Sequence, residues 1–555
     1  MKAILFKIPH TSFYEQPTTH ILIHALSNIS NIIMSSFISS FTTTTTLNCA
    51  VIGAASVLMY VLAKKLSLKT PWPEVAGKRP FLGNSIGGIE NLIETVEKWA
   101  EIYGQGGIFT FVLFGKTVVC VCDEKTASLL ESKRPYSITR RKNLVKALDS
   151  LGVKGVFSAE GSTWQKDRRI VGPALNKKNV REYTEMVKLV ANRLTKKWTA
   201  MMKENPEGAV VSINSDIIAT TMDIISLVAF AKDLDSVSKG YSDLIDVLDT
   251  LFRKVIVRIV TPVPYWKIPI IGQYLDGAGF AVDKSKRDCN DIIQEYLSET
   301  NNNEIEHEKR SKTFLGKVIA LNQKSEMSLS TERMIGNLLT MFAAGSETTA
   351  GTAIVALYEI ANDKTGLQDE LAREVEAMEN YDSASLEDFT KCLPRLRSLV
   401  YEVLRLKGPA PFMGVENKDP ITIDGVDLPP NTAFFLMTRY ISTREDSNSE
   451  KCTPRGPNDL CPKDFCPRRW LLLEEEENGP ISVINPSYRT GFRAFGAGMR
   501  VCPGRDLAEI EILVIISSLL RTFKISLEPG HPPMRLVTRF TQTPDGKIRL
   551  LLAPR

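Results

Sequence analysis

A single cysteine in the C-terminal part of the chain stands among residues that could serve a metal-bearing cofactor. The segment 492–508 reads FRAFGAGMRVCPGRDLA and contains Cys502, but no histidine and no second cysteine. Asp506 and Glu509 favour the start of a helix, so Cys502 precedes a helix N-terminus, where backbone N–H groups and the helix dipole stabilise a thiolate. One thiolate is too few ligands for structural zinc, which takes four, but it suffices as the axial ligand of a haem iron.

The neighbours of Cys502 fit the same chemistry. Gly498 and Gly504 have no Cβ, so the backbone can approach the sulfur and a flat group can approach the backbone. Arg500 could pair with a haem propionate, and Phe495 could pack against the ring. The alternatives are a buried structural cysteine or an ordinary glycine-rich turn. A dinucleotide fingerprint does not fit, because its third glycine is missing.

A second candidate lies in the middle of a long predicted helix, 330–362. The segment 343–352, AAGSETTAGT, is rich in glycine and threonine, which are weak helix formers. Ala344, Gly345 and Thr348 fall on one face, where two small groups leave space for a ligand and a hydroxyl can relay a proton. The alternative is a stripe of small residues that lets another helix pack closely.

Two further pairs of residues have helical spacing. Glu402 and Arg405 are i, i+3 neighbours in YEVLR (401–405), and Trp164 and Arg168 are i, i+4 neighbours in WQKDR (164–168). Taken alone, the first pair is typical of a surface ion pair, which contributes little to stability. The second pattern is weak by itself.

The cysteine segment resembles the haem-binding signature of the cytochrome P-450 family, the haem-thiolate monooxygenases, and the other patterns follow that family's landmarks in order. The resemblance covers nearly all of residues 71–555. The N-terminal apolar segment and the Pro-rich linker resemble those of the family's membrane-anchored eukaryotic branch. The resemblance implies that Cys502 is the axial ligand of the iron of haem b. The residues that would contact the haem are Cys502, Arg500, Phe495, Gly496, Gly498, Gly504, Trp164, Arg168, Ala344 and Gly345.

The same resemblance assigns roles outside the haem loop. Thr348 and Glu347 match the family's threonine and acid, which implies that they deliver protons to oxygen. Glu402 and Arg405 match its E-x-x-R motif, and Arg469 in FCPRRW (465–470) would join them in a buried network behind the haem loop. The sequence departs from the pattern at position 468, where an arginine replaces the usual acid.

The elements that must position these residues are mostly helices. Helical periodicity covers 180–203, 214–231, 241–258 and 283–299, whereas strand-like runs are limited to 107–123, 421–428, 432–441 and 547–553. Strands do not alternate with helices, so neither a doubly wound sheet nor a barrel fits. We predict a mainly α protein with small β-sheets, namely the cytochrome P-450 fold, with a single large haem domain behind an N-terminal membrane anchor.

The N-terminal part has the composition of an anchor. Residues 16–63 contain no Asp, Glu, Lys or Arg, and 47–63 are the most apolar, at the lower limit for spanning a bilayer. Lysines follow at once, which places the remainder in the cytosol by the positive-inside rule. A buried helix or a removed targeting peptide are the alternatives. We predict four parts: a Ser/Thr-rich segment with features of a targeting sequence (1–46), a transmembrane anchor (47–66), a Pro-rich linker (67–80) and the haem-thiolate catalytic domain (81–555).

Composition excludes several other functions. A net charge of +5 over 555 residues, without a basic tract, argues against nucleic-acid binding. Only five histidines are present, and their positions exclude Ser-His-Asp and Cys-His catalysis. The nine cysteines form no C-x-x-C pair, which indicates a reducing compartment. Three of them fall in an apparent insertion at 444–466, which we interpret as a surface loop.

The resemblance implies a reaction and its partners. A haem-thiolate monooxygenase would activate dioxygen with two electrons from a separate NADPH-dependent reductase and insert one oxygen atom into a small apolar substrate: a sterol, fatty acid, terpenoid or xenobiotic. We expect pocket walls at 138–157, 340–348, 409–416 and 537–542. We expect a single-pass protein of the endoplasmic reticulum with a cytosolic catalytic domain, with organellar targeting as the alternative. A haem-thiolate isomerase or dehydratase of the same fold and a non-catalytic haem-binding protein stay open.

Overall fold

The fold of the catalytic part follows from helices that pack around one apolar core. The computed structural model describes residues 68–79, 83–113, 115–205, 208–240, 243–261, 264–299, 304–325, 328–444, 462–476, 479–484 and 492–555. Residues 69–113 and 117–555 belong to one compact unit, which is described below. The predicted segments 1–46 and 47–66 and most of the insertion at 444–466 lie outside the described residues.

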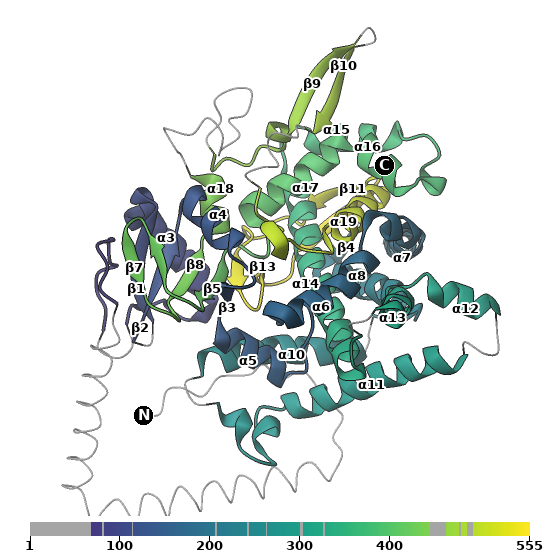
Figure 1. Cartoon of the computed structure of the whole chain (residues 1–555). Helices are drawn as coiled ribbons and strands as arrows, with labels where there is room; N and C mark the ends of the chain where they lie inside the picture. Colours follow the sequence, from purple (N-terminus) through teal and green to yellow (C-terminus); the bar gives the residue numbers. More distant parts are fainter. Residues whose placement is uncertain are drawn as a thin grey trace, which may run out of the picture. The chain divides into compact units, whose positions relative to one another are not determined.

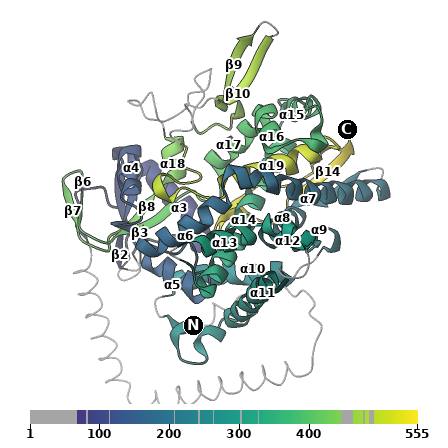
Figure 2. The same cartoon turned by 45° about the vertical axis from the view of Figure 1, so that its right-hand side comes forward.

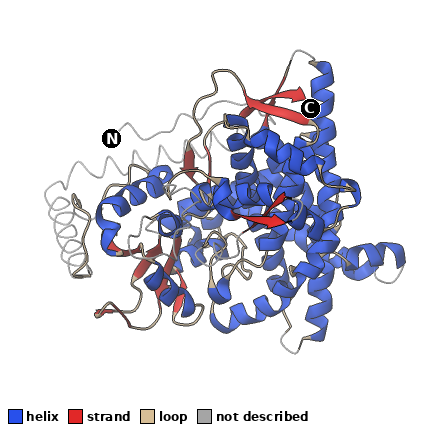
Figure 3. Ribbon diagram, turned by 90° about the horizontal axis from the view of Figure 1, so that it is seen from above, coloured by secondary structure: helices blue, strands red, loops and turns tan. Residues whose placement is uncertain are grey.

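The described chain is mainly helical with small sheets, which confirms the predicted fold class (Figure 1, Figure 3). The helices are α3 (Leu92–Tyr103), α4 (Glu124–Ser132), α5 (Lys142–Ser150), α6 (Gly161–Ala174), α7 (Lys177–Glu204), α8 (Ile213–Phe230), α9 (Ser236–Lys239), α10 (Asp243–Val260), α11 (Ala278–Glu299), α12 (Glu304–Ser311), α13 (Phe314–Lys324), α14 (Thr331–Asn362), α15 (Leu367–Glu376), α16 (Leu386–Cys392), α17 (Pro394–Lys407), α18 (Thr438–Thr443) and α19 (Arg505–Leu520).

The strands form five small sheets among the described residues. They are β1 (Ile108–Leu113), β2 (Lys116–Val121), β3 (Ile138–Arg140), β4 (Ala209–Ser212), β5 (Met413–Asn417), β6 (Ile421–Ile423), β7 (Val426–Leu428), β8 (Ala433–Leu436), β9 (Leu471–Glu476), β10 (Gly479–Ile484), β11 (Phe523–Leu527), β12 (Leu536–Thr538), β13 (Gln542–Pro544) and β14 (Arg549–Pro554). The largest sheet has the order β1-β2-β8-β5-β3, and a second has the order β11-β14-β4.

In the largest sheet, β2 and β8 pair in parallel and the other described pairs, β5–β8 and β3–β5, are antiparallel. The predicted strand at 432–441 is wrong in its second half, because β8 ends at Leu436 and α18 begins at Thr438. Arg439 of α18 donates to both carboxylate oxygens of Glu97 in α3, at 2.7 and 2.6 Å. Strand preference depends on tertiary context, and this ion pair is one of the contacts that hold the segment as a helix against α3.

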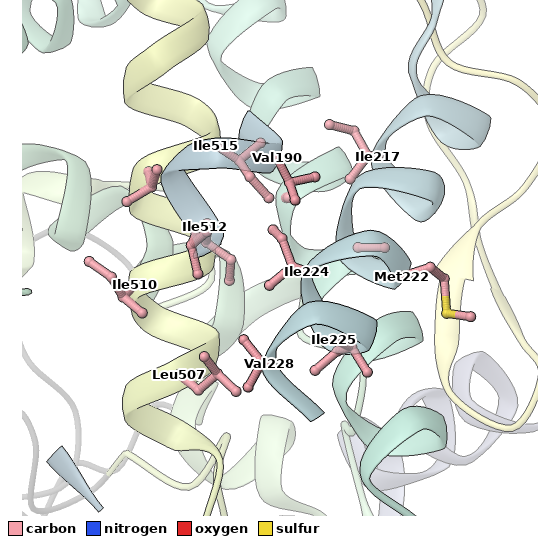
Figure 4. Packing of buried hydrophobic residues seen from close by; sticks show 14 of the residues in the cluster. Val190, Ile217, Met222, Ile224, Ile225, Val228, Leu507, Ile510, Ile512 and Ile515 are labelled. Carbon is pink, nitrogen blue, oxygen red and sulfur yellow. The ribbon is translucent and has the colours of Figure 1, made fainter. Parts of the chain in front are cut away.

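The core lies where α7, α8, α14 and α19 meet. Figure 4 shows Val190 of α7, Ile224 and Val228 of α8, and Leu507 and Ile515 of α19 directed toward one another. All five are buried, and each side chain of this size contributes about 1.5–3 kcal/mol when it leaves water. The packing fixes α14 and α19, which carry the candidate site residues (Figure 2).

Within the described residues, α8 is the one helix long and apolar enough to cross a membrane. Its mean hydropathy is 1.4, but 83% of it is buried inside the protein. Such burial is typical of the central helix of a folded domain, so α8 belongs to the core.

Candidate functional site

The loop that carries Cys502 is closed by its own backbone. The Cys502 N–H donates to the Phe495 carbonyl at 2.9 Å, and the Gly496 N–H donates to the Arg493 carbonyl at 2.9 Å. Gly496 and Gly498 have φ values of +70° and +65°, a left-handed conformation that favours glycine. At Gly498 a Cβ would also lie 3.3 Å from the carbonyl oxygen of Glu131. The loop therefore requires glycine where the sequence has it.

The Cys502 side chain is accessible to solvent. Burial against the protein raises the pKa of its thiol, and the Gly504 backbone N–H, Arg168 and Arg505 lower it by less. The stabilisation of a thiolate that was expected at this helix start is thus present at the Gly504 N–H. A positive partner such as a metal ion would stabilise the thiolate further. Gly504 leaves room beside the sulfur, since a Cβ there would lie 3.9 Å from Sγ.

Charged and aromatic contacts hold the loop in place. Arg493, which is buried, pairs with Glu124 and Glu131 of α4. The Arg505 guanidinium lies 5.6 Å above the Phe495 ring. Phe492 packs with its ring centroid 5.4 Å from that of Trp470, at an interplanar angle of 82°. The loop is thereby fixed to α4 on one side and to the segment after residue 466 on the other.

Glu402, Arg405 and Arg469 meet in a buried network. Arg405 donates from Nε and Nη2 to the two oxygens of Glu402 at 2.8 and 2.7 Å, and Arg469 Nε donates to Glu402 Oε1 at 2.9 Å. The Trp470 indole N–H and the Cys466 backbone N–H also donate to Glu402, each at 2.9 Å. The side chains of Glu402 and Arg469 are 0% exposed, which excludes the surface ion pair. Arg468, at the position that departs from the pattern, is exposed and pairs with Glu370.

The small residues of α14 face two different neighbours, a cavity and helix α8. Ala344 is exposed to a cavity, whereas a Cβ on Gly345 would lie 2.5 Å from Ile225 Cδ1 of α8. The absence of a side chain at Gly345 therefore permits close packing of two helices, the alternative interpretation of this stripe. Thr348 donates its hydroxyl to the Ala344 carbonyl at 2.7 Å, so it lies one turn from the cavity wall. Glu347 is half-buried beside it.

Trp164 and Arg500 stack, and Arg168 lies nearby on the same helix. The Arg500 guanidinium is 5.0 Å from the centre of the Trp164 ring, and the ring is buried in α6. Arg500 donates from Nη1 to the Val156 carbonyl at 3.0 Å and forms an ion pair with Glu160 at 2.5 Å. Burial lowers the pKa of Arg168, and a negative charge on the Cys502 sulfur raises it by a smaller amount. Arg168 therefore lies close enough to Cys502 for the two charges to interact.

Two arginines that the sequence motifs did not mark complete a cationic cluster. Arg134 is 2% exposed, and burial lowers its pKa to about 10. Arg140 is held by Nε donation to the Phe157 carbonyl at 2.5 Å, and burial lowers its pKa too, with Arg134 and Arg500 adding to the effect. No spacing in the sequence pointed to either residue, because they meet Arg500 only through the tertiary fold.

The cluster contains buried polar atoms with unused hydrogen-bonding capacity. Within the described residues, Arg134 Nε and Nη2 and Arg500 Nε find no hydrogen-bond partner. Glu160 lies near all three of Arg134, Arg140 and Arg500, while Glu131 also acts on Arg134 and Asp167 also acts on Arg500. Buried guanidinium N–H groups without a partner are costly by themselves, and they fit an anionic ligand.

An apolar cavity lies against α14. It holds about 480 Å³ of space free of protein atoms, part of it open to solvent, and it is lined by Leu148, Val153, Phe157, Leu251, Phe252, Val255, Leu339, Thr340, Ala343, Ala344 and Phe540. Three of the four expected walls contribute residues, but 409–416 does not. The wall formed by α10 was missed, since its helical pattern did not reveal which neighbours it faces. Val153 and Phe157 belong to the segment whose carbonyls hold Arg500 and Arg140, so the cavity and the cationic cluster are adjacent.

Metal sites of another type find no support in this part of the chain. Among residues 68–555 that the structure describes, no group of three or more His, Cys, Asp and Glu side chains could hold a metal ion. Cys502 is thus a single potential ligand.

Comparisons with known proteins agree with this geometry. A sequence profile described as Cytochrome P450 matches residues 73–550. Protein LUTEIN DEFICIENT 5, chloroplastic, from Arabidopsis thaliana is 24% identical over 531 residues, which cover 93% of this chain and 83% of that protein. Sterol 26-hydroxylase, mitochondrial, from Mus musculus is 25% identical over 409 residues, which cover 71% and 72%. A crystal structure of a cytochrome P450, CYP102L1, superposes with a TM-score of 0.69 at 19% identity and covers 88% of this chain and 100% of that one, a likeness of fold.

Proposed function

Because the chain belongs to the cytochrome P450 family of monooxygenases, we propose that it is a haem-thiolate enzyme in which Cys502 is the axial ligand of haem b. The observation that carries this proposal is that Cys502 is accessible to solvent at the start of α19 and has the positive charge of Arg168 close to its sulfur, while the arginine cluster includes Arg500, two residues before it. When bound, the haem activates dioxygen and supplies the oxidising power for the insertion of one oxygen atom into the substrate.

The arginine cluster supports the placement of the two haem propionates. Arg134 and Arg500 offer guanidinium N–H groups that have no partner among the described residues, and such groups could donate to the propionate carboxylates. Trp164 orients Arg500 by stacking. Charge-assisted hydrogen bonds of this type give both affinity and a fixed orientation.

The loop residues would bring the sulfur and the ring together. Gly496, Gly498 and Gly504 add no side chains to the loop, and Phe495, whose ring lies under the Arg505 guanidinium, would pack against the haem. The positive charge of the iron would add to the stabilisation of the Cys502 thiolate by the protein, because metal binding deprotonates a coordinating thiol. Glu402, Arg405 and Arg469 would act at a distance, as a rigid support for the loop.

Thr348 and Glu347 are proposed to deliver protons. The Thr348 hydroxyl already hydrogen-bonds the Ala344 carbonyl, which places it one turn from the cavity wall. From there it can hold a water molecule or reach an acid, and the neighbouring Glu347 is the nearest acid in the sequence. A positioned proton donor of this type is worth roughly 10²–10⁴-fold in rate. Ala344 supports the site by leaving space, and we propose that Gly345 contributes mainly through its contact with α8.

The substrate is proposed to be a small apolar molecule. Apart from Thr340, every side chain that lines the cavity is apolar, so binding would be driven by burial of apolar surface. Sterols, fatty acids, terpenoids and xenobiotics all meet this requirement. We propose that two electrons come from a separate NADPH-dependent reductase.

Membrane attachment through residues 47–66 is part of the proposal. Large apolar side chains on the described surface also gather in one stretch, where Ile268, Ile270, Ile271 and Phe280 are 47–90% exposed. We propose a single-pass endoplasmic reticulum protein. The chloroplastic and mitochondrial relatives favour organellar targeting by residues 1–46 as the second candidate. Deletion of residues 1–66 should release most of the protein from membranes and preserve haem binding; complete retention on membranes would contradict the anchor.

Turnover with isotopically labelled dioxygen tests the reaction. The holoprotein is reconstituted with a reductase and NADPH, and products from a panel of apolar substrates are analysed by mass spectrometry. We expect one labelled oxygen atom per product and none from Cys502→Ser. Rearranged or dehydrated products without label would instead favour the isomerase or dehydratase, and haem binding without any product would favour the non-catalytic alternative.

A further inference from the structure

One fully buried arginine fastens the connection between α10 and α11 to α5. The Arg258 side chain is 0% exposed and donates from Nε and Nη2 to the two oxygens of Asp276, at 3.0 and 2.9 Å. Its remaining nitrogen, Nη1, donates to the Ser150 hydroxyl at 2.8 Å. Arg258 lies in the last turn of α10, Asp276 precedes α11, and Ser150 ends α5. One guanidinium therefore joins three segments, whose helices are labelled in Figure 1 and Figure 2.

Asp276 is held from several sides. The Tyr265 hydroxyl donates to it at 2.6 Å, and the Ala278 backbone N–H donates at 3.1 Å. Burial raises the pKa of Asp276, but the hydrogen bonds from Arg258 and Tyr265 outweigh this effect, and the net pKa lies below its ordinary value. The carboxylate is therefore charged, and the junction is an ion pair with every oxygen in use.

This junction lies beside the cavity. Leu251 and Val255 line the cavity from α10, and Arg258 follows on the same helical face at i+7 and i+3. On the other side, Leu148 lines the cavity from α5, two residues before Ser150. Arg258 thus connects two walls of the cavity, and α10 cannot move away from α5 without breaking the hydrogen bond to Ser150.

We propose that Arg258 is a positioning residue that holds α10 against α5 and thereby limits the size of the molecules that enter the cavity. The proposal rests on the proposed function, since it treats the cavity as the substrate site. Separation of α10 from α5 breaks the buried Arg258 contacts and leaves charges without partners, so the closed arrangement of the two helices dominates and the open one is rare. Small ligands enter the cavity in the closed arrangement, whereas bulky ligands enter only when the helices separate.

A purely structural role would predict something different. Arg193 of α7 also forms a bidentate pair, with Asp233 and with one contact of 2.6 Å; this pair is more exposed than the Arg258–Asp276 pair, and neither of its residues lines the cavity. If Arg258 served stability alone, Arg193→Gln and Arg258→Gln would differ only in thermal stability. If it controls entry, only Arg258→Gln changes the discrimination between small and bulky ligands.

The test uses full-length holoprotein and two haem ligands of different size, imidazole and 1-phenylimidazole. Association and dissociation rates are followed by absorbance after rapid mixing for wild type, Arg258→Gln, Asp276→Asn and Arg193→Gln. A change in the open population from about 1% to about 10% would speed the 1-phenylimidazole rates about tenfold and leave imidazole unchanged. We expect this for the Arg258 and Asp276 variants and not for Arg193→Gln. An unchanged size preference, or the same change in Arg193→Gln, would overturn the proposal.

A milder variant and an independent measurement keep the test decisive. Ser150→Ala removes the hydroxyl that accepts from Arg258 and donates to the Ala147 carbonyl, and it keeps the weaker 3.3 Å contact of Arg258 to the Ser150 carbonyl. It should therefore fold and give a smaller change in the same direction. Wild-type rates would overturn the proposal even if Arg258→Gln does not fold. Hydrogen exchange of residues 243–260 needs no haem and should accelerate in the Ser150 and Arg258 variants relative to residues 177–204. If wild type binds no haem, the proposed function fails. If hydrogen exchange of residues 243–260 is unchanged in the Ser150 and Arg258 variants, the proposed role of Arg258 fails, whatever the outcome for haem.

Discussion

Replacement of Glu402 by alanine should abolish the folded, haem-loaded protein. In the structure, Glu402 receives hydrogen bonds from Arg405, Arg469, Trp470 and the Cys466 backbone, all between 2.7 and 2.9 Å, and is 0% exposed. Removal of one partner of a buried ion pair costs about 3–5 kcal/mol, and here two guanidiniums lose the same partner. A buried donor left without an acceptor, such as the Trp470 indole, costs about 1–3 kcal/mol more.

These costs are comparable to the whole stability of a typical domain, about 5–15 kcal/mol. The assay is haem bound per protein chain together with the midpoint of urea unfolding. Glu402→Gln keeps the shape and one acceptor but not the charge, so it should be intermediate. Arg468→Ala is the matched control, because its exposed pair with Glu370 contributes less than about 1 kcal/mol. Glu402→Ala with wild-type stability and haem content would refute the reasoning.

Three further predictions concern single residues. Thr348→Ala should keep NADPH consumption but divert it to peroxide, so that product formed per NADPH falls; unchanged coupling would remove the proton-delivery role. Gly498→Ala should lower haem content, because the left-handed φ and the 3.3 Å approach of the Glu131 carbonyl both oppose a Cβ, at about 1–3 kcal/mol; normal haem content would show that the loop adapts. Glu511 of α19 is buried, and burial raises its pKa well above 4.5. The folded protein therefore holds this proton more tightly than the unfolded chain, so this group should lower the free energy of unfolding as pH rises above about 4.5. Glu511→Leu should flatten this dependence in unfolding experiments from pH 4 to 8, and parallel slopes for the two proteins would contradict it.

Local signals in the sequence account for much of the fold and of the site. The helix predicted at 330–362 is α14, Thr331–Asn362, because the Ser330 hydroxyl accepts the Arg333 N–H at 3.3 Å and caps its start. Gly496 and Gly498 stand where the loop backbone is left-handed. Such features depend on neighbours in the chain, so their patterns are visible in the sequence.

The features that sequence reasoning missed all depend on distant contacts. Arg134 reaches Arg500 only after folding. Leu251 faces the cavity through the packing of α10 on α5. The thiol pKa of Cys502 is likewise set by burial, which local sequence does not reveal.

The central claim is that Cys502 binds the haem iron as a thiolate, and the carbon monoxide difference spectrum of the reduced protein tests it most directly. Wild type, Cys502→Ser and Cys502→His are purified in parallel with Cys392→Ser as a control for loss of an exposed cysteine. We predict that wild type and Cys392→Ser give the band characteristic of haem-thiolate proteins, and that both Cys502 variants lose it. A Cys502 variant that keeps this band, or a wild-type holoprotein that lacks it, would contradict the assignment.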